Sequence, residues 1–173
     1  MDVSRRSRFG LLLLFVVPLL LIDQTTKLWA FSAMALGQSI ALPGPVDLTL
    51  VFNRSNAFGL APDLGEVTRW GLAGINLAVA GILGFLVCSR DEPRTMATGL
   101  AFIVAGGIGN AIDRIWLGAV IDMFDATETG FIWVFNAADV FINVGIGLVL
   151  LEMLVLSRAR ERRHKASSSA LAP

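Results

Sequence analysis

The chain has 173 residues, enough for one domain. Hydrophobic residues make up 55% of it, charged residues 16%, and the mean hydropathy is +0.70. A soluble chain of this length could not bury so much apolar surface, so the composition excludes an ordinary soluble domain. The formal net charge is zero, which gives no general attraction to nucleic acid. The single cysteine, Cys88, excludes a disulfide within the chain and a cysteine metal cluster.

Four apolar stretches are each long enough to cross a bilayer, which takes about 20 mainly apolar residues. They lie near residues 9–30, 70–87, 96–112 and 135–156. The longest connection is 31–69, and a basic tail, 157–173, follows the last stretch. We therefore predict an all-α membrane protein with four transmembrane helices in a single integral membrane domain, residues 1–173.

Basic residues predict the direction of the spans. Most of them flank one end of the predicted bundle: Arg5, Arg6, Arg8, Arg90, Arg94, Arg158, Arg160, Arg162, Arg163 and Lys165. The positive-inside rule then places both termini in the cytoplasm and the 31–69 and 114–134 connections outside. The four tryptophans agree, since all fall at the outer end of a predicted span: Trp29, Trp70, Trp116 and Trp133.

A cleavable signal peptide is an alternative interpretation of the N-terminal region. Residues 5–22 resemble one, and Ala33-Met34-Ala35 resembles its cleavage site. Against this, the apolar run is long and ends in the charged residues Asp23 and Lys27 rather than in small residues.

Charged residues gather at the outer ends of the spans, although a carboxylate at mid-membrane costs about 2.5–3.5 kcal/mol. Asp23 and Lys27 are four residues apart, on one helix face, where they can pair. We prefer a salt bridge that holds the first span against the bundle over a direct catalytic role.

The end of the third span carries a second polar group. Asn110, Asp113 and Arg114 are spaced to share one helix face, and the glycines before them favour close packing of another helix. Asp113 is interpreted as neutralising a nearby cation. Arg114 is a planar donor suited to a carbonyl or carboxylate, or else an interface anchor.

Two further acids lie in apolar surroundings, Asp122 after the third span and Asp139 just inside the fourth. A polar turn at residues 126–130 lets the chain return, so both carboxyls can meet at one depth, while Asp125 and Glu128 are expected to be solvated. Two carboxyls held close together share one proton, which suits hydrolysis of an amide by an activated water. From the residues alone, an ion pathway or a metal site stays open.

Five motifs in order resemble the lipoprotein signal peptidase family, bacterial signal peptidase II, over roughly residues 23–143. They are Asp23-Gln24-Thr25-Thr26-Lys27, Asn53-Arg54-Ser55-Asn56-Ala57-Phe58-Gly59, Gly106-Gly107-Ile108-Gly109-Asn110-Ala111-Ile112-Asp113-Arg114, Val120-Ile121-Asp122 and Phe135-Asn136-Ala137-Ala138-Asp139. The resemblance implies an intramembrane aspartic endopeptidase of the bacterial inner membrane. It also implies retention of the first span, against the signal-peptide alternative.

The implied substrates are prolipoproteins whose cysteine carries diacylglycerol, cut just before that cysteine. Residue by residue, the resemblance makes Asp122 and Asp139 the catalytic pair, near the outer face, with neither metal nor cofactor. Its supporting or substrate-binding positions are Asp23, Lys27, Asn53, Asn110, Asp113, Arg114 and Asn136. It further implies membrane lipid as a partner, sensitivity to globomycin-type inhibitors, and a small sheet within residues 39–60.

The sequence departs from the family pattern at Ser55 and Asn56, where glycine and a small residue are usual, and at Met123, where phenylalanine is common. These changes put the geometry of the outer loop in question and leave the acids untouched. Two other functions were weighed. A metal-dependent membrane transferase needs several acids spaced along one helix, and a transporter favours acids at mid-span in repeated halves. Neither pattern is present in the sequence.

Overall fold

The computed structural model describes residues 5–55, 64–130, 133–156 and 158. The predictions concerning Asn56 and the basic tail fall outside these residues. The helices are α1 (Arg5–Ala33), α2 (Glu66–Ser89), α3 (Arg94–Leu117) and α4 (Ala137–Leu151), the last continued by a π-helix (Glu152–Leu156). A short 3₁₀ turn spans Thr127–Thr129.

Four helices are long and apolar enough to cross a membrane, which confirms the predicted number of spans. The third is longer than predicted. It continues past residue 112 to Leu117, because the apolar residues after Arg114 extend it until Gly118 adopts a left-handed conformation (φ 82°) and caps it. Arg114 is therefore part of the helix and does not begin the connection. The described part of α1 is likewise one continuous helix through Asp23 and Lys27.

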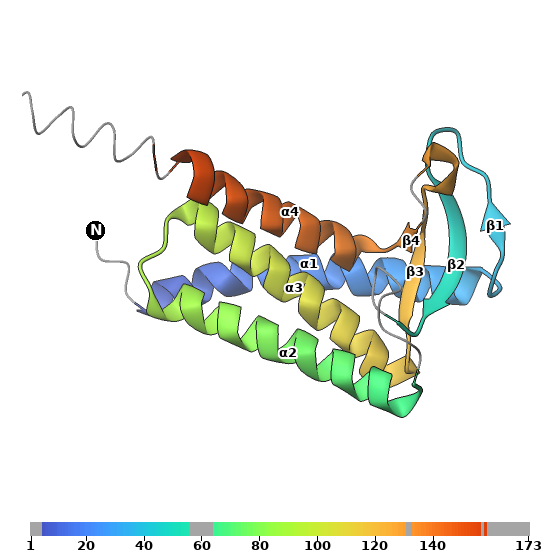
Figure 1. The fold of residues 1–173 in the computed structure, drawn as a ribbon, viewed down its shortest axis with the longest axis horizontal. Coiled ribbons are helices and arrows are strands. Elements are labelled where there is room, and N and C mark those ends of the chain that lie inside the picture. Colours follow the sequence, from blue (N-terminus) through green and yellow to red (C-terminus); the bar gives the residue numbers. More distant parts are fainter. Residues whose placement is uncertain (1–4, 56–63, 131–132, 157, 159–173) are drawn as a thin grey trace, which may run out of the picture.

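A four-stranded antiparallel sheet lies at the end of the bundle opposite the start of α1 (Figure 1). Its strands, in spatial order, are β1 (Ser39–Ile40), β2 (Asp47–Asn53), β3 (Val120–Asp125) and β4 (Val134–Phe135). The predicted small sheet is confirmed, but only two of its strands come from the first connection. The other two come from the connection between α3 and α4, so the sheet joins both loops.

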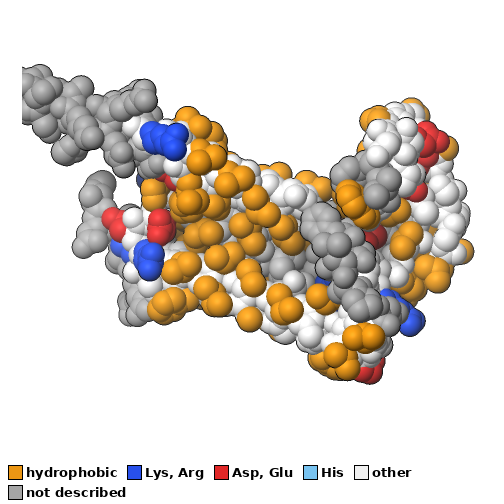
Figure 2. Space-filling view, in the orientation of Figure 1, with side chains coloured by type: hydrophobic (Ala, Val, Ile, Leu, Met, Phe, Trp, Pro, Cys, Tyr) orange, Lys and Arg blue, Asp and Glu red, His pale blue; other side chains and the backbone are white. Residues whose placement is uncertain are grey.

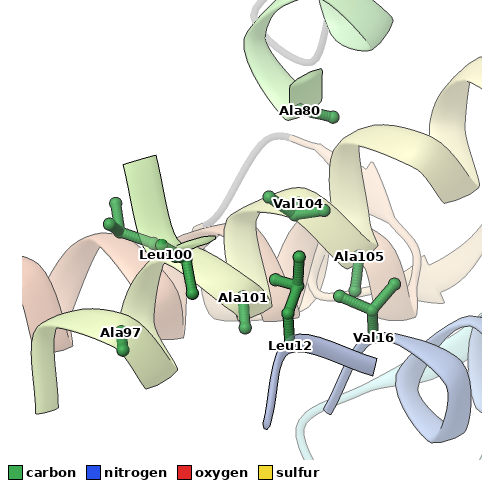
Figure 3. Close-up of a cluster of buried hydrophobic side chains, with 9 residues drawn as sticks. Leu12, Val16, Ala80, Ala97, Leu100, Ala101, Val104 and Ala105 are labelled. Carbon is green, nitrogen blue, oxygen red and sulfur yellow. The ribbon is translucent and has the colours of Figure 1, made fainter. Parts of the chain in front are cut away.

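The core of the bundle is built from small and branched side chains. Leu12 and Val16 of α1 approach Ala101 and Ala105 of α3, and Ala80 of α2 faces the same cluster (Figure 3). Apolar side chains also cover the outside of the bundle, between charged groups at its two ends (Figure 2). Such a surface suits lipid, whose tails are as apolar as the side chains.

Glycines allow α3 and α4 to pack closely, as the sequence predicted. A Cβ atom added to Gly106 would meet the carbonyl oxygen of Ala138 and the side chain of Ile142. Gly99 and Gly145 face each other, and each would place a Cβ against the carbonyl oxygen of the other. Backbone contacts of this kind cannot yield as the end of a flexible side chain can, so these glycines fix the distance between the helices.

We expect Gly106→Ala to push α3 away from the start of α4 and to destabilise the protein by about 1–3 kcal/mol, the usual effect of overpacking. Gly74→Ala is the matched control, because nothing lies within 4 Å of a Cβ there. Alanine also favours helix by about 1 kcal/mol over glycine. Thermal unfolding in detergent should show a loss for Gly106→Ala alone, and equal melting temperatures for both variants would contradict this packing argument.

Candidate functional site

A bulge in β2 aligns Asn53 with Asp122. Strands β2 and β3 pair Leu48 with Phe124 and then Val51 with Asp122, so β2 carries one extra residue between these pairs. Asn53 lies two residues beyond Val51 and therefore on the same face of the sheet as Asp122. Its Nδ2 donates to Asp122 Oδ2 at 3.0 Å. The segment that carries Asp122 into the predicted turn is thus a strand.

Asn136 connects the start of α4 to the sheet. It is the N-cap residue of α4, and its side-chain oxygen accepts a hydrogen bond from the backbone N–H of Asp139 at 3.0 Å. Its Nδ2 donates to Asp122 Oδ1 at 2.6 Å and to Asn110 Oδ1 at 3.2 Å. The side chain is fully buried, and its hydrogen bonds join the start of α4 to Asp122 and Asn110.

Asp139 completes a capping box at the start of α4. Its Oδ2 accepts from the backbone N–H of Asn136 at 3.3 Å, and its Oδ1 accepts from Asn110 Nδ2 at 2.9 Å. Asp139 is half-buried, whereas Asp122 is only 2% exposed. Asn136 and Asn110 therefore link the two aspartates, from β3 and α4, in one hydrogen-bond network.

Burial and a neighbouring charge change the acidity of Asp122. Desolvation of its carboxyl is the main cause, and the nearby charge of Asp139 adds to it, so the pKa of Asp122 rises to about 7. Hydrogen bonds from Asn53 and Asn136 and the charge of Lys27 act in the opposite direction. A carboxyl of this kind holds its proton near neutral pH and can donate it.

A second, fully buried polar cluster lies beside the aspartates. Lys27 Nζ contacts Asp23 Oδ2 at 3.0 Å and Asp113 Oδ2 at 2.9 Å, which confirms the predicted Asp23–Lys27 pair and the interpretation of Asp113 as the partner of a cation. Gln24, which sequence reasoning did not single out, donates to both carboxylates. Its position inside the first motif, between the two charged residues, was the available signal.

Arg114 holds backbone groups rather than a side-chain acid. Its guanidinium donates to the carbonyl oxygens of Ser55 at 2.9 Å and Asn110 at 3.3 Å. Among the described residues its buried Nε has no hydrogen-bond partner. The carbonyl oxygen of Arg114 in turn accepts from Arg69 Nε at 2.8 Å. Arg114 therefore anchors the beginning of the 53–59 motif next to the aspartates.

Two neighbouring acids, Asp125 and Glu128, differ in their surroundings. Asp125 is not simply solvated as expected, because Thr49 and Thr127 donate to its carboxylate and lower its pKa. Glu128 is exposed. Within the described part of the chain, no three His, Cys, Asp or Glu side chains are grouped so that they could hold a metal ion.

The chain matches a known family over most of its length. Residues 15–155 match the family model described as signal peptidase (SPase) II. The chain belongs to the signal peptidase II family. This assignment confirms the resemblance seen in the motifs and the prediction of a membrane peptidase, and it argues against the transferase and the transporter.

Individual relatives of this chain agree with the family assignment. A lipoprotein signal peptidase of Caulobacter vibrioides is 38% identical over 148 residues, covering 83% of this chain and 86% of the relative. That of Azoarcus sp. strain BH72 is 37% identical over 147 residues, covering 83% and 80%. Among solved structures, a bacterial membrane enzyme superposes with a TM-score of 0.75 at 25% identity, covering 84% of this chain and 88% of the other. This chain therefore shares its fold with a solved bacterial membrane enzyme.

Proposed function

We propose that this member of the family removes signal peptides from prolipoproteins by an aspartic mechanism in which Asp122 and Asp139 form the catalytic pair. The family supplies the reaction, removal of a signal peptide from a prolipoprotein. The observation that carries the mechanism is the network in which Asn136 and Asn110 bind both carboxyls at once.

The unequal surroundings of the carboxyls suggest a division of labour. Asp122, buried and with its pKa raised to about 7, carries the shared proton. The half-buried Asp139, as carboxylate, takes a proton from a water whose oxygen attacks the scissile carbonyl carbon, while Asp122 protonates the carbonyl oxygen. Collapse of the tetrahedral intermediate breaks the C–N bond. Asp139 gives the proton it took from water to the leaving nitrogen, and a hydroxyl of the intermediate returns a proton to Asp122 as the carbonyl forms again, with no covalent enzyme intermediate.

The position of the pair suits a lipid-modified substrate. Asp139 is followed by Val140, which is 40% exposed on the apolar outer surface of α4. A cysteine carrying diacylglycerol could therefore keep its acyl chains in the bilayer while the bond before it reaches the aspartates. This arrangement supports cleavage just before the lipidated cysteine, and we expect a globomycin-type inhibitor to compete for the same place.

The proposed orientation puts the site at the outer face of the bacterial inner membrane. Arg8, Arg90 and Arg94 lie at the opposite end of the helices, and the positive-inside rule assigns that end, with both termini, to the cytoplasm. The sheet that carries Asp122 would then lie on the outer surface, where secreted prolipoproteins arrive.

A cleavage assay with purified protein in liposomes tests this function. The diacylglyceryl-modified prolipoprotein should be cut at the cysteine, its unmodified form at least about 100-fold more slowly because remote binding energy is lost. A chelator should leave the rate unchanged, since an aspartic pair needs no metal. A rate abolished by chelator and restored by a divalent metal, or equal rates on both substrates, would overturn the corresponding part of the proposal.

The raised pKa of Asp122 predicts the pH dependence of kcat. Activity requires this carboxyl protonated, so kcat should fall as the pH rises through about 7. The hydrogen bond from Asn53 favours the ionised form, so Asn53→Ala raises the pKa of Asp122 and moves this fall to higher pH. Rates measured from pH 5 to 9 check both the position and the sign. A shift to lower pH in Asn53→Ala would contradict the assignment.

A further inference from the structure

The two carboxylates beside Lys27 each hold the backbone next to one proposed catalytic aspartate. Asp23 Oδ1 accepts from the N–H of Ala138 at 2.9 Å, and Ala138 immediately precedes Asp139. Asp113 Oδ2 accepts from the N–H of Ile121 at 3.2 Å, and Ile121 immediately precedes Asp122. Because a peptide unit is planar, fixing these N–H groups restricts the direction in which the chain enters Ala138 and Ile121, one residue before each aspartate.

Lys27 joins these two halves. Its ammonium group lies 3.0 Å from Asp23 Oδ2 and 2.9 Å from Asp113 Oδ2, and Gln24 Nε2 donates to the same two carboxylates at 3.0 and 3.2 Å. Exposure of the side chains of Asp23, Lys27 and Asp113 is 2% or less. The distance between the two supporting carboxylates is thus set by one buried cation together with the amide of Gln24.

The same ammonium also orients Asn110. Lys27 Nζ lies 2.9 Å from Asn110 Oδ1, while Asn110 Nδ2 donates to Asp139 at 2.9 Å. A cation can only face the oxygen of an amide, so Lys27 determines that the NH₂ group of Asn110 faces Asp139. Lys27 therefore reaches Asp122 through Asp113 and through Asn110 with Asn136, and it reaches Asp139 through Asp23 and through Asn110.

We propose that Lys27, Asp23 and Asp113 form a clamp that sets the spacing and orientation of Asp122 and Asp139. In this role Lys27 is a positioning residue, and the proposal rests on the aspartic mechanism proposed above. A displacement of about 1 Å in a reacting group can lower a rate by about 100-fold. A salt bridge that only held α1 to the bundle would influence folding and leave the chemistry of folded molecules intact.

The charges around the clamp predict how each variant changes the pH dependence of kcat. The charges of Asp139 of α4, Lys27 of α1 and Arg114 of α3 act on Asp122. The carboxylate of Asp113 lies nearby, on the N–H of the residue before Asp122. Lys27→Met removes a cation and should move the high-pH fall of kcat to higher pH. Asp113→Asn removes an anion and should move it to lower pH. The predicted shifts are opposite, although both variants loosen the clamp.

The test compares kcat, KM and the pH profile of purified, folded variants on the lipidated prolipoprotein. Because Lys27→Met leaves two buried carboxylates without their cation and can unfold the chain, Asp23→Asn and Asp113→Asn carry the test. We expect kcat to fall by about 100-fold with KM within about threefold. Asp91→Asn is the matched control, since it removes a carboxylate from the exposed Arg8–Asp91 pair, far from the aspartates, and should keep the parent profile.

Asp23→Asn and Asp113→Asn proteins that melt at lower temperature yet keep the parent kcat and pH profile would show a purely structural salt bridge and overturn the clamp. A different result would show that the proposed mechanism is wrong: Asp122→Asn or Asp139→Asn would remain active. A lowered kcat in folded Asp23→Asn and Asp113→Asn, with the high-pH fall of Asp113→Asn moved to lower pH, establishes the clamp.

Discussion

Asp122→Asn and Asp139→Asn should each lower kcat by about 10³-fold or more, with little change in melting temperature. An asparagine preserves the size of the side chain and one acceptor oxygen, so the hydrogen bonds to Asn53 or Asn110 can persist in part. What it cannot do is exchange a proton with water or with the substrate carbonyl. General acid–base groups commonly contribute about 10²–10⁴-fold, and in the proposed mechanism one aspartate acts as the base and the other as the acid.

The matched controls are Asp125→Asn, on the same strand as Asp122, and Glu128→Gln in the following turn. Asp125 is held by Thr49 and Thr127 and Glu128 is exposed, so neither touches the network around the aspartates. Both controls should cleave within about threefold of the parent rate. Near-parent activity in either catalytic variant, measured in single turnover to exclude slow product release, would mean that the pair is wrongly assigned.

Two replacements of Asn136 should distinguish its contribution to capping α4 from its contribution to catalysis. Asn136→Ala removes the cap of α4 and both amide donors, so we expect a loss of about 1 kcal/mol in stability and about 100-fold in kcat. Asn136→Ser keeps an oxygen that can cap the helix but has no NH₂ group for Asp122 and Asn110. It should therefore retain most of the stability and lose nearly as much activity.

Thermal unfolding and kcat, measured on the same preparations, distinguish these contributions. If Asn136→Ser cleaves like the parent, the 2.6 Å hydrogen bond to Asp122 has no part in catalysis and Asn136 serves α4 alone. The alanine variant then measures the cap by itself. A serine variant as unstable as the alanine variant would show that the cap needs the amide.

The spans and the polar positions could be predicted from the sequence because their signals are local. Apolar runs of membrane length predict helices, and the spacing of Asp23 and Lys27 predicts their pairing on one face. The number of spans and this pair are confirmed. The end of α3 was placed too early, because Asn110, Asp113 and Arg114 were read as the edge of the membrane although the helix continues to Leu117.

The strand and hydrogen bonds around the aspartates could not be predicted, because they depend on pairing between segments far apart in the sequence. Residues 119–124 are almost uniformly apolar and show no alternation, so nothing in them indicates that Val120–Asp125 is a strand paired with Asp47–Asn53. The bulge that aligns Asn53 with Asp122 depends on that pairing. Every residue except proline has a backbone N–H group. The sequence therefore does not indicate that the N–H groups of Ile121 and Ala138 donate to Asp113 and Asp23.

The contact between Asp23 and the N–H of Ala138 joins the first helix to the last. Ribosomes deliver helices to the membrane in chain order, so α1, α2 and α3 enter the bilayer before Asp139 has been added. Until α4 arrives, the chain lacks both the second aspartate and the amide that Asp23 holds. If Asp122 and Asp139 are the catalytic pair proposed above, a partly synthesised molecule cannot cleave peptide bonds, and activity begins only when the final span is in place.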